Sequence, residues 1–234
     1  MDDTAVAQQD WAAAARALDG QGHALLPGLL TAAQCHTLAA LYDAPAAFRS
    51  RIVMERHGFG RGQYQYFAYP LPPLLQTLRQ TLYPRLVPIA NGWNAQRGLG
   101  LRYPAGLLDF LAHCHAAGQT RPTPLLLRYG AGDYNCLHQD LYGEHVFPLQ
   151  VAVLLSQPGE DFSGGEFVMT ETYAGHVRAD VVPLRQGDAV VFAVHERPVS
   201  GVRGRLRTPA LRHGVSLVRS GQRHTLGVIF HDAH

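Results

Sequence analysis

The stretch that decides the fold is YNCLHQD, residues 134–140. It reads as a short strand that leads directly into His138 and Asp140, and residues i and i+2 of an extended chain project from the same face. His213, on a later predicted strand, supplies a third ligand. Two histidines and one carboxylate are a ligand set that suits Fe(II) and leaves coordination positions open. The sequence therefore predicts a metal centre formed by His138, Asp140 and His213.

Short apolar runs separated by glycine, proline, aspartate and serine fill the chain from Pro124 onward, as is typical of strands joined by turns. The predicted strands cover residues 125–129, 134–138, 147–155, 165–171, 181–184, 189–194, 211–218 and 223–230. Residues 219–221 are expected to form a tight hairpin turn between the last two strands. Because no helical pattern separates the strands, a double-sheet jelly roll is favoured over an open parallel sheet.

The first 120 residues or so have mainly helical patterns. Thr31 and Gln34 have the spacing of a capping box, and an apolar repeat of helical period follows them. Leucines at helical spacing continue over residues 75–86, interrupted by Pro84 and Pro88, and a third helix is expected over 104–118. Residues 63–67 alternate like a strand. We therefore expect an α+β protein in which a helical layer, residues 1–120, packs on an all-β core, residues 121–234, as one structural unit.

Composition places the chain among ordinary globular proteins, because 47% of its residues are hydrophobic and 16% are charged. The acidic N-terminus lacks the basic and apolar regions of a secretory signal, and no apolar run approaches the roughly 18 to 20 residues of a membrane span. Cys35, Cys114 and Cys136 are odd in number and far apart, which favours a reducing compartment. We therefore expect a cytoplasmic protein without a membrane partner.

A carboxylate clamp is predicted beside the metal. Arg223 follows His213 by ten residues, and its guanidinium is a bidentate partner for a carboxylate. Thr225 shares a strand face with Arg223, so its hydroxyl can bind the same group. A metal at one end and a guanidinium at the other define a slot for a small dicarboxylic acid such as 2-oxoglutarate.

These residues belong to a longer series of motifs. The series comprises Tyr129-Gly130-Ala131-Gly132, His138-Gln139-Asp140, Gly164-Gly165-Glu166-Phe167, Gly187-Asp188-Ala189-Val190-Val191-Phe192, and His213 followed by Gly221-Gln222-Arg223. In this combination the chain resembles the Fe(II)/2-oxoglutarate-dependent dioxygenases, and within them the prolyl hydroxylase branch, over about residues 124–231.

The resemblance implies a double-stranded β-helix that binds iron through His138, Asp140 and His213. It further implies that Arg223 grips the distal carboxylate of 2-oxoglutarate and that Tyr129 is the tyrosine that contacts this co-substrate. The implied reaction consumes O2 and couples oxidative decarboxylation of 2-oxoglutarate, to succinate and CO2, to hydroxylation of a substrate C–H bond.

Two alternatives compete with parts of this interpretation. His195 is a rival third ligand, because it follows a predicted strand and has Arg205 at the same ten-residue distance. A protein of another class, either a cupin-like zinc hydrolase or isomerase or a binding module, would accept the same three ligands. Arg223 and Thr225 discriminate, because a hydrolase has no need of a carboxylate clamp beside its metal.

The substrate is indicated least directly. The segment 49–69 combines basic with aromatic side chains, as a nucleic-acid groove does, although a polar-faced strand at the edge of the sandwich explains the same aromatics; they are Arg49, Arg51, Arg56, His57 and Arg61, with Tyr64, Tyr66, Phe67 and Tyr69. Oxidative demethylation of alkylated nucleic acid is therefore one hypothesis. The net charge of only +2, and the absence of the Arg-x-Asn-x-Thr-x-Arg pattern of the alkylation-repair dioxygenases, favour a peptide, protein or amino-acid side chain instead.

Overall fold

Two antiparallel β-sheets face each other at the centre of the molecule. The computed structural model describes residues 4–141, 143–201 and 205–234. The strands are β1 (His23–Leu26), β2 (Phe48–Val53), β3 (Gly60–Arg61), β4 (Gln63–Phe67), β5 (Leu125–Gly130), β6 (Tyr134–His138), β7 (Leu149–Leu154), β8 (Phe162–Gly164), β9 (Phe167–Tyr173), β10 (His176–Val182), β11 (Ala189–Ala193), β12 (Val199–Ser200), β13 (Leu206–Arg207), β14 (Ala210–Val215) and β15 (Val218–Val228).

The larger sheet has the order β1-β11-β7-β15-β5-β4-β2, with β8 also paired to β15, and the smaller sheet has the order β10-β9-β14-β6-β3. The buried apolar core includes residues of both sheets and of the helices. The two facing sheets agree with the predicted jelly roll. The short strands β12 and β13 pair with each other.

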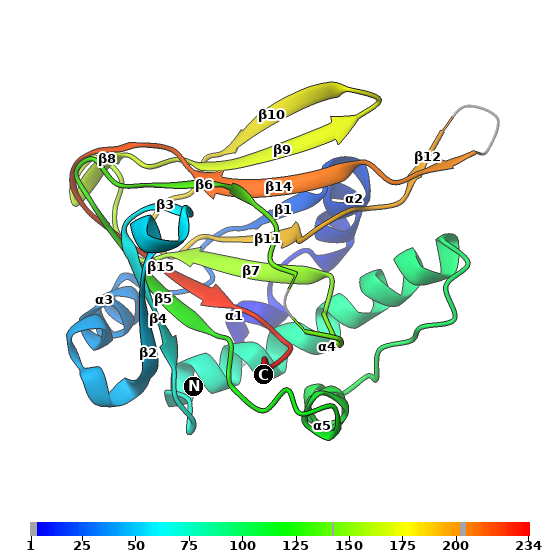
Figure 1. Cartoon of the computed structure of the whole chain (residues 1–234), viewed down its shortest axis with the longest axis horizontal. Coiled ribbons are helices and arrows are strands. Elements are labelled where there is room, and N and C mark those ends of the chain that lie inside the picture. The colour runs from blue at the N-terminus through cyan, green and yellow to red at the C-terminus, as the bar shows by residue number, and fades with distance from the viewer. Residues whose placement is uncertain (1–3, 142, 202–204) are drawn as a thin grey trace.

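The helices are α1 (Thr4–Ala7), α2 (Trp11–Gln21), α3 (Ala32–Ala40), α4 (Pro73–Gln96) and α5 (Leu107–Ala116), with three short 3-10 turns, η1 (Leu41–Asp43), η2 (Pro45–Ala47) and η3 (Met54–His57). Figure 1 shows α4 and α5 on the side of the larger sheet that faces away from the smaller one. Within the described ranges, no helix combines the length and the apolar character that a membrane span requires.

Helix α4 continues through the two prolines that were expected to interrupt it. Pro84 and Pro88 both lie inside the helix. Its apolar side, which includes Leu78, Leu82 and Leu86, is almost fully buried. Burial of this face against the sheet outweighs the backbone hydrogen bonds that the prolines remove, because packing supplies most of a helix's stability. The capping box at Thr31 is confirmed, with both of its hydrogen bonds to Gln34 present.

The N-terminal half of the chain contributes more strands than the sequence predicted. The alternating segment 63–67 forms β4 as expected, but β1, β2 and β3 were not anticipated. Strand β1 pairs with β11, about 165 residues away, and β2 pairs with β4. The strands that pair with β1, β2 and β3 come from distant segments or from short hairpins, so the local pattern of polar and apolar residues does not reveal these three strands.

The expected hairpin between the last two strands is wrong. Strands β14 and β15 lie in different sheets, and residues 219–221 are already part of β15. The chain crosses from one sheet to the other between Val215 and Val218, and the first part of β15 pairs with β8. This crossing places His213 and Arg223 on opposite walls of the sandwich instead of side by side in one ladder.

A buried ion pair fixes the C-terminal segment to α4. The Arg79 guanidinium donates to the backbone oxygens of Ile229 and Phe230 and lies 2.8 Å from Asp232 Oδ1, with both side chains almost completely buried. Asp232 also accepts hydrogen bonds from the Tyr69 hydroxyl and contacts His115 Nε2 at 2.8 Å. Segments far apart in the sequence thus meet at one carboxylate below β15.

We expect Asp232→Ala to lower the free energy of unfolding by about 3 to 5 kcal/mol, because it leaves the Arg79 charge buried without its partner. The matched control is Asp43→Ala, which removes an exposed ion pair to Arg128 and should cost about 0 to 1 kcal/mol. Urea unfolding of both variants measures the difference. Equal losses would show that the buried pair is not what anchors the C-terminal segment.

Candidate active site

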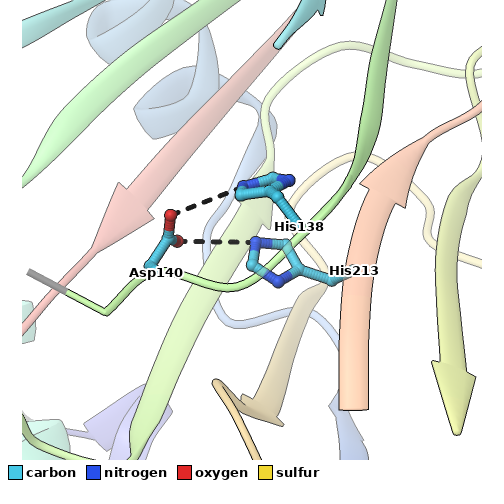
Figure 2. A group of neighbouring side chains, drawn as sticks. All are labelled: His138, Asp140 and His213. Carbon is cyan, nitrogen blue, oxygen red and sulfur yellow. Dashed lines mark ion pairs between the residues drawn. The ribbon is translucent and has the colours of Figure 1, made fainter. Parts of the chain in front are cut away.

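The three predicted metal ligands meet at one end of the space between the sheets. His138 ends β6, Asp140 follows it in the next loop, and His213 lies on β14 directly opposite His138 in the strand register. One ligand atom from each residue lies within 4.8 Å of the others. Figure 2 shows both imidazoles turned toward the carboxylate, with His138 Nε2 at 3.4 Å from Asp140 Oδ1 and His213 Nε2 at 3.5 Å from Oδ2.

The close approach of β6 and β14 depends on Gly214. The register between the two strands shifts in a bulge between His213 and Val215. A Cβ atom added at Gly214 would lie only 2.7 Å from the backbone oxygen of Asn135, which is closer than real side chains come. A glycine beside the distal histidine therefore allows the two ligand strands to approach each other.

The electrostatics of the cluster favour an ionised carboxylate. Burial would raise the pKa of Asp140, but hydrogen bonds and charge from His138 and His213 hold it well below its usual range. Burial lowers the pKa of His213 below its ordinary value, whereas Asp140 raises that of His138 in spite of burial. One carboxylate and two imidazoles at this spacing match the donor set of a facial Fe(II) site, so the residues fit the metal.

The rival ligand His195 does not join the cluster. Its side chain is exposed, and the group of ligand atoms found among the described residues consists of His138, Asp140 and His213 alone. Only its backbone is near the site, because the His195 carbonyl accepts hydrogen bonds from Leu211 and from the Gln139 side chain.

The predicted clamp lies on the opposite wall, on β15. Arg223 is 1% exposed, donates to the Thr225 hydroxyl, and pairs across the strands with Tyr129 on β5. Its guanidinium carbon lies 5.7 Å from the Tyr129 ring centre and 5.8 Å from that of Phe162. Burial lowers the pKa of Arg223 to about 10, so the group remains charged near neutral pH.

Two buried polar atoms at the clamp have no hydrogen-bond partner within the described part of the chain. They are Arg223 Nε and the Tyr129 hydroxyl, which is near Asn135 but not in hydrogen-bond geometry with it. A buried cation with unpaired donors requires an anion. The arrangement of Arg223, Thr225 and Tyr129 therefore fits one carboxylate of a small diacid, and their roles toward 2-oxoglutarate stay a prediction.

Gly165 makes room for the arginine. It has φ +64°, a conformation that favours glycine, and an added Cβ would lie 3.0 Å from Arg223 Cδ and 2.9 Å from a methyl group of Val218. The second glycine of the Gly164-Gly165 motif is thus explained by the packing of the clamp.

A single cavity joins the metal cluster to the clamp. His138, Asp140 and His213 line it together with Arg223, Thr225 and Tyr129, so all six predicted site residues share one space. Its other walls are largely apolar or aromatic and include Phe59, Tyr64, Tyr66, Phe167 and Phe192. The cavity therefore runs without a break from Arg223 to the metal ligands, between largely apolar walls.

Some residues of the site were not identified from the sequence. Gln150 is 4% exposed, lines the cavity, and its amide nitrogen has no partner among the described residues. It pairs with Phe192, whose ring centre is 4.5 Å from that of His213, so it lies at the metal end of the cavity. A lone glutamine within an apolar strand is the only signal the sequence contains.

Comparison with known proteins identifies the family of the chain. The chain matches the model of the Oxygenase-NA family, described as an oxygenase catalysing oxidative methylation of damaged DNA, over residues 62–233. It is 50% identical over 168 residues to two uncharacterized proteins of Mycobacterium tuberculosis, a match that covers 71% of this chain and 72% of theirs.

Solved structures show the same fold at low sequence identity. A prolyl-4-hydroxylase from Pseudomonas putida aligns with a TM-score of 0.56 and 16% identity, covering 96% of this chain and 99% of its own. A prolyl hydroxylase from Trichoplax adhaerens, solved with a hypoxia-inducible factor peptide, gives 0.57 and 12%, covering 95% and 89%. A 2OG-Fe(II) oxygenase-family oxidoreductase from Burkholderia pseudomallei gives 0.54 and 17%, covering 94% and 90%.

The family match spans most of the chain and includes the metal cluster, the clamp and the cavity between them. The chain therefore belongs to the Oxygenase-NA family, which is a family of 2OG-Fe(II) oxygenases.

Proposed function

We propose that this oxygenase holds Fe(II) through His138, Asp140 and His213, binds 2-oxoglutarate through Arg223, Thr225 and Tyr129, and oxidises a damaged base in nucleic acid. The observation that carries the first part is the shared cavity, in which two imidazoles and an ionised carboxylate face a buried guanidinium whose Nε has no hydrogen-bond partner among the described residues. A zinc hydrolase or isomerase of the cupin type would not require that cation.

The residues of the chain bind, orient and shield the reactants. Fe(II) and 2-oxoglutarate, when bound, would supply with O2 the oxidation of a substrate C–H bond, one oxygen atom going to the substrate and the other to the succinate formed when 2-oxoglutarate loses CO2. Arg223 takes the distal carboxylate, while Thr225 and Tyr129 fix its orientation through their hydroxyl groups. Asp140 stays ionised as a ligand because His138 and His213 hold its pKa low. The apolar lining limits the access of water.

The family description and the cavity mouth support a nucleobase substrate. Phe59, Tyr64 and Tyr66 line the cavity from the β2–β4 segment, where flat aromatic rings suit a base extruded from its stack. The same segment carries Arg56 and Arg61 as exposed side chains, with Glu55 as the exposed acidic neighbour. Arg49 and Arg51 are engaged within the protein, with Pro122 and Gln63. The unpaired Gln150 amide suits a substrate that supplies a hydrogen-bond acceptor.

A peptide, protein or amino-acid side chain is the second candidate. It is favoured by the net charge of only +2 and by the absence of the Arg-x-Asn-x-Thr-x-Arg pattern from the last strands. Such a substrate would be held by hydrogen bonds and apolar contacts to the same aromatic walls.

The metal ligands are tested by exchanging the two candidate distal histidines. His213→Ala should abolish high-affinity Fe(II) binding and turnover, because it removes one of three protein ligands. His195→Ala should leave the metal bound, because the exposed His195 side chain lies outside the cluster. Metal content after anaerobic Fe(II) loading and gel filtration measures both. If the two variants exchange these outcomes, His195 is the distal ligand.

Arg223→Ala should weaken 2-oxoglutarate binding by about 30- to 1000-fold, because losing a buried charge-assisted pair costs about 2 to 4 kcal/mol. Arg223→Lys keeps a charge but not the fork, so it should restore only part of the affinity. Calorimetric titration in the presence of Mn(II) measures the affinity without turnover. An Arg223→Ala variant that binds 2-oxoglutarate as tightly as the wild type would remove the clamp from the mechanism.

The substrate class is tested by succinate release with methylated single-stranded DNA and with a proline-containing peptide library, each at two salt concentrations. Turnover on DNA should fall steeply with salt, since each neutralised phosphate contact releases counterions. Arg56→Ala and Arg61→Ala should each reduce the salt slope by about 1, whereas Arg85→Ala, an exposed arginine on α4, should not. Turnover on peptides alone, with a shallow salt dependence, would replace the nucleic-acid substrate by the second candidate.

A further inference from the structure

The two metal-site histidines are oriented by different means. His138 Nδ1 lies 2.8 Å from the backbone oxygen of Cys136, and such a bond fixes the orientation of a ligating ring. His213 Nδ1 is buried and has no hydrogen-bond partner within the described ranges. The distal ring therefore lacks the outer contact that orients most metal-binding histidines, and another feature must place it.

Aromatic packing fixes the plane of the His213 ring. The Phe192 ring centre lies 4.5 Å from that of His213. The Phe167 ring is stacked with the His213 ring, with the ring centres 6.0 Å apart and an interplanar angle of 20°. Apolar contacts of this kind limit rotation of the His213 side chain, but they do not stop the ring from moving together with the backbone of β14. The position of Nε2 therefore depends on where β14 lies relative to Asp140.

Gln139 connects these two elements directly. Its side-chain nitrogen donates to the backbone oxygen of Leu211 at 2.7 Å and to that of His195 at 3.2 Å. Leu211 lies on β14 two residues before His213, and Gln139 stands between His138 and Asp140. Strand β6 ends at His138, so along this edge β14 runs past its partner strand. The Gln139 side chain therefore donates to β14 a hydrogen bond at a position where β6 no longer continues.

We propose that Gln139 is a positioning residue that sets the distance between the Asp140 loop and the His213 strand before the metal binds. The proposal rests on the metal site of the proposed function, and it assigns a role to the central residue of the His138-Gln139-Asp140 motif. Loss of the cross-link lets the distal strand move relative to the two proximal ligands. The three donors then spend less time in a geometry that one ion can bridge.

The test compares Gln139→Met with Gln186→Met. Methionine keeps the length of glutamine and removes its donor. Gln186 is the matched control because it is equally half-buried and donates to a backbone oxygen, that of Leu155, at 2.9 Å, but lies outside the cavity lining. Without 2-oxoglutarate, the dissociation constant for Mn(II) should rise about 10- to 100-fold in Gln139→Met, the range typical of residues that support metal ligands. In Gln186→Met it should not change.

A spectroscopic readout separates positioning from general stability. The visible absorption of bound Co(II) reports coordination geometry, so it should change in Gln139→Met at saturating metal and remain as in the wild type in Gln186→Met. Thermal melting without metal shows whether each variant folds. Gln139→Asn keeps the amide, but its shorter side chain cannot reach the backbone oxygen of Leu211. We expect it to behave like Gln139→Met, and it replaces that variant if Gln139→Met does not fold.

Unchanged Mn(II) affinity and an unchanged Co(II) spectrum in the folded Gln139 variants would overturn the proposal. An equal loss in Gln186→Met would also overturn it, since the effect would then follow from any lost backbone contact. A wild-type protein that binds neither ion would instead refute the proposed metal site itself.

Discussion

The Arg223 guanidinium, buried in the interior without a salt bridge to any described carboxylate, is the interaction around which the cavity is organised. Burying such a charge is costly unless a partner compensates it. The protein offers only partial compensation, through the Thr225 hydroxyl and the faces of Tyr129 and Phe162. The remaining requirement is for an anion, and the unpaired Tyr129 hydroxyl beside it is placed to bind the same group.

The crossing of the chain from one sheet to the other places the anion-binding Arg223 opposite the metal ligands. Arg223 on β15 and His213 on β14 are ten residues apart but belong to opposite sheets. In the proposed function, a ligand bound at Arg223 therefore extends across the cavity toward the metal cluster. Gly165, between β8 and β9, opens space for the arginine, and Gly214, at the bulge within β14, lets the two ligand strands approach, so each end of the slot depends on a glycine.

The sequence predicted those parts of the structure that are determined locally. The His138-Gln139-Asp140 spacing was sufficient to find two neighbouring ligand candidates, although Asp140 lies in the loop after β6 and not on the strand. The capping box at Thr31 specified the start of α3. Prediction failed where distant segments decide the outcome. Residues 219–221 have turn chemistry but lie within β15, because β8 and β5 provide partners for that strand. Pro84 and Pro88 remain helical because α4 packs on the sheet. Gln139 and Gln150 have roles that only their three-dimensional surroundings reveal.

The central claim is that one ligand spans the clamp and the metal. The most direct test is the affinity of the wild-type protein for 2-oxoglutarate, measured by calorimetry with and without saturating Mn(II). If 2-oxoglutarate contacts both ends of the cavity, the metal should tighten its binding by roughly 5- to 150-fold, and 2-oxoglutarate should tighten metal binding by the same factor. Equal affinities with and without metal would show that the two ends do not share a ligand, and would contradict this account.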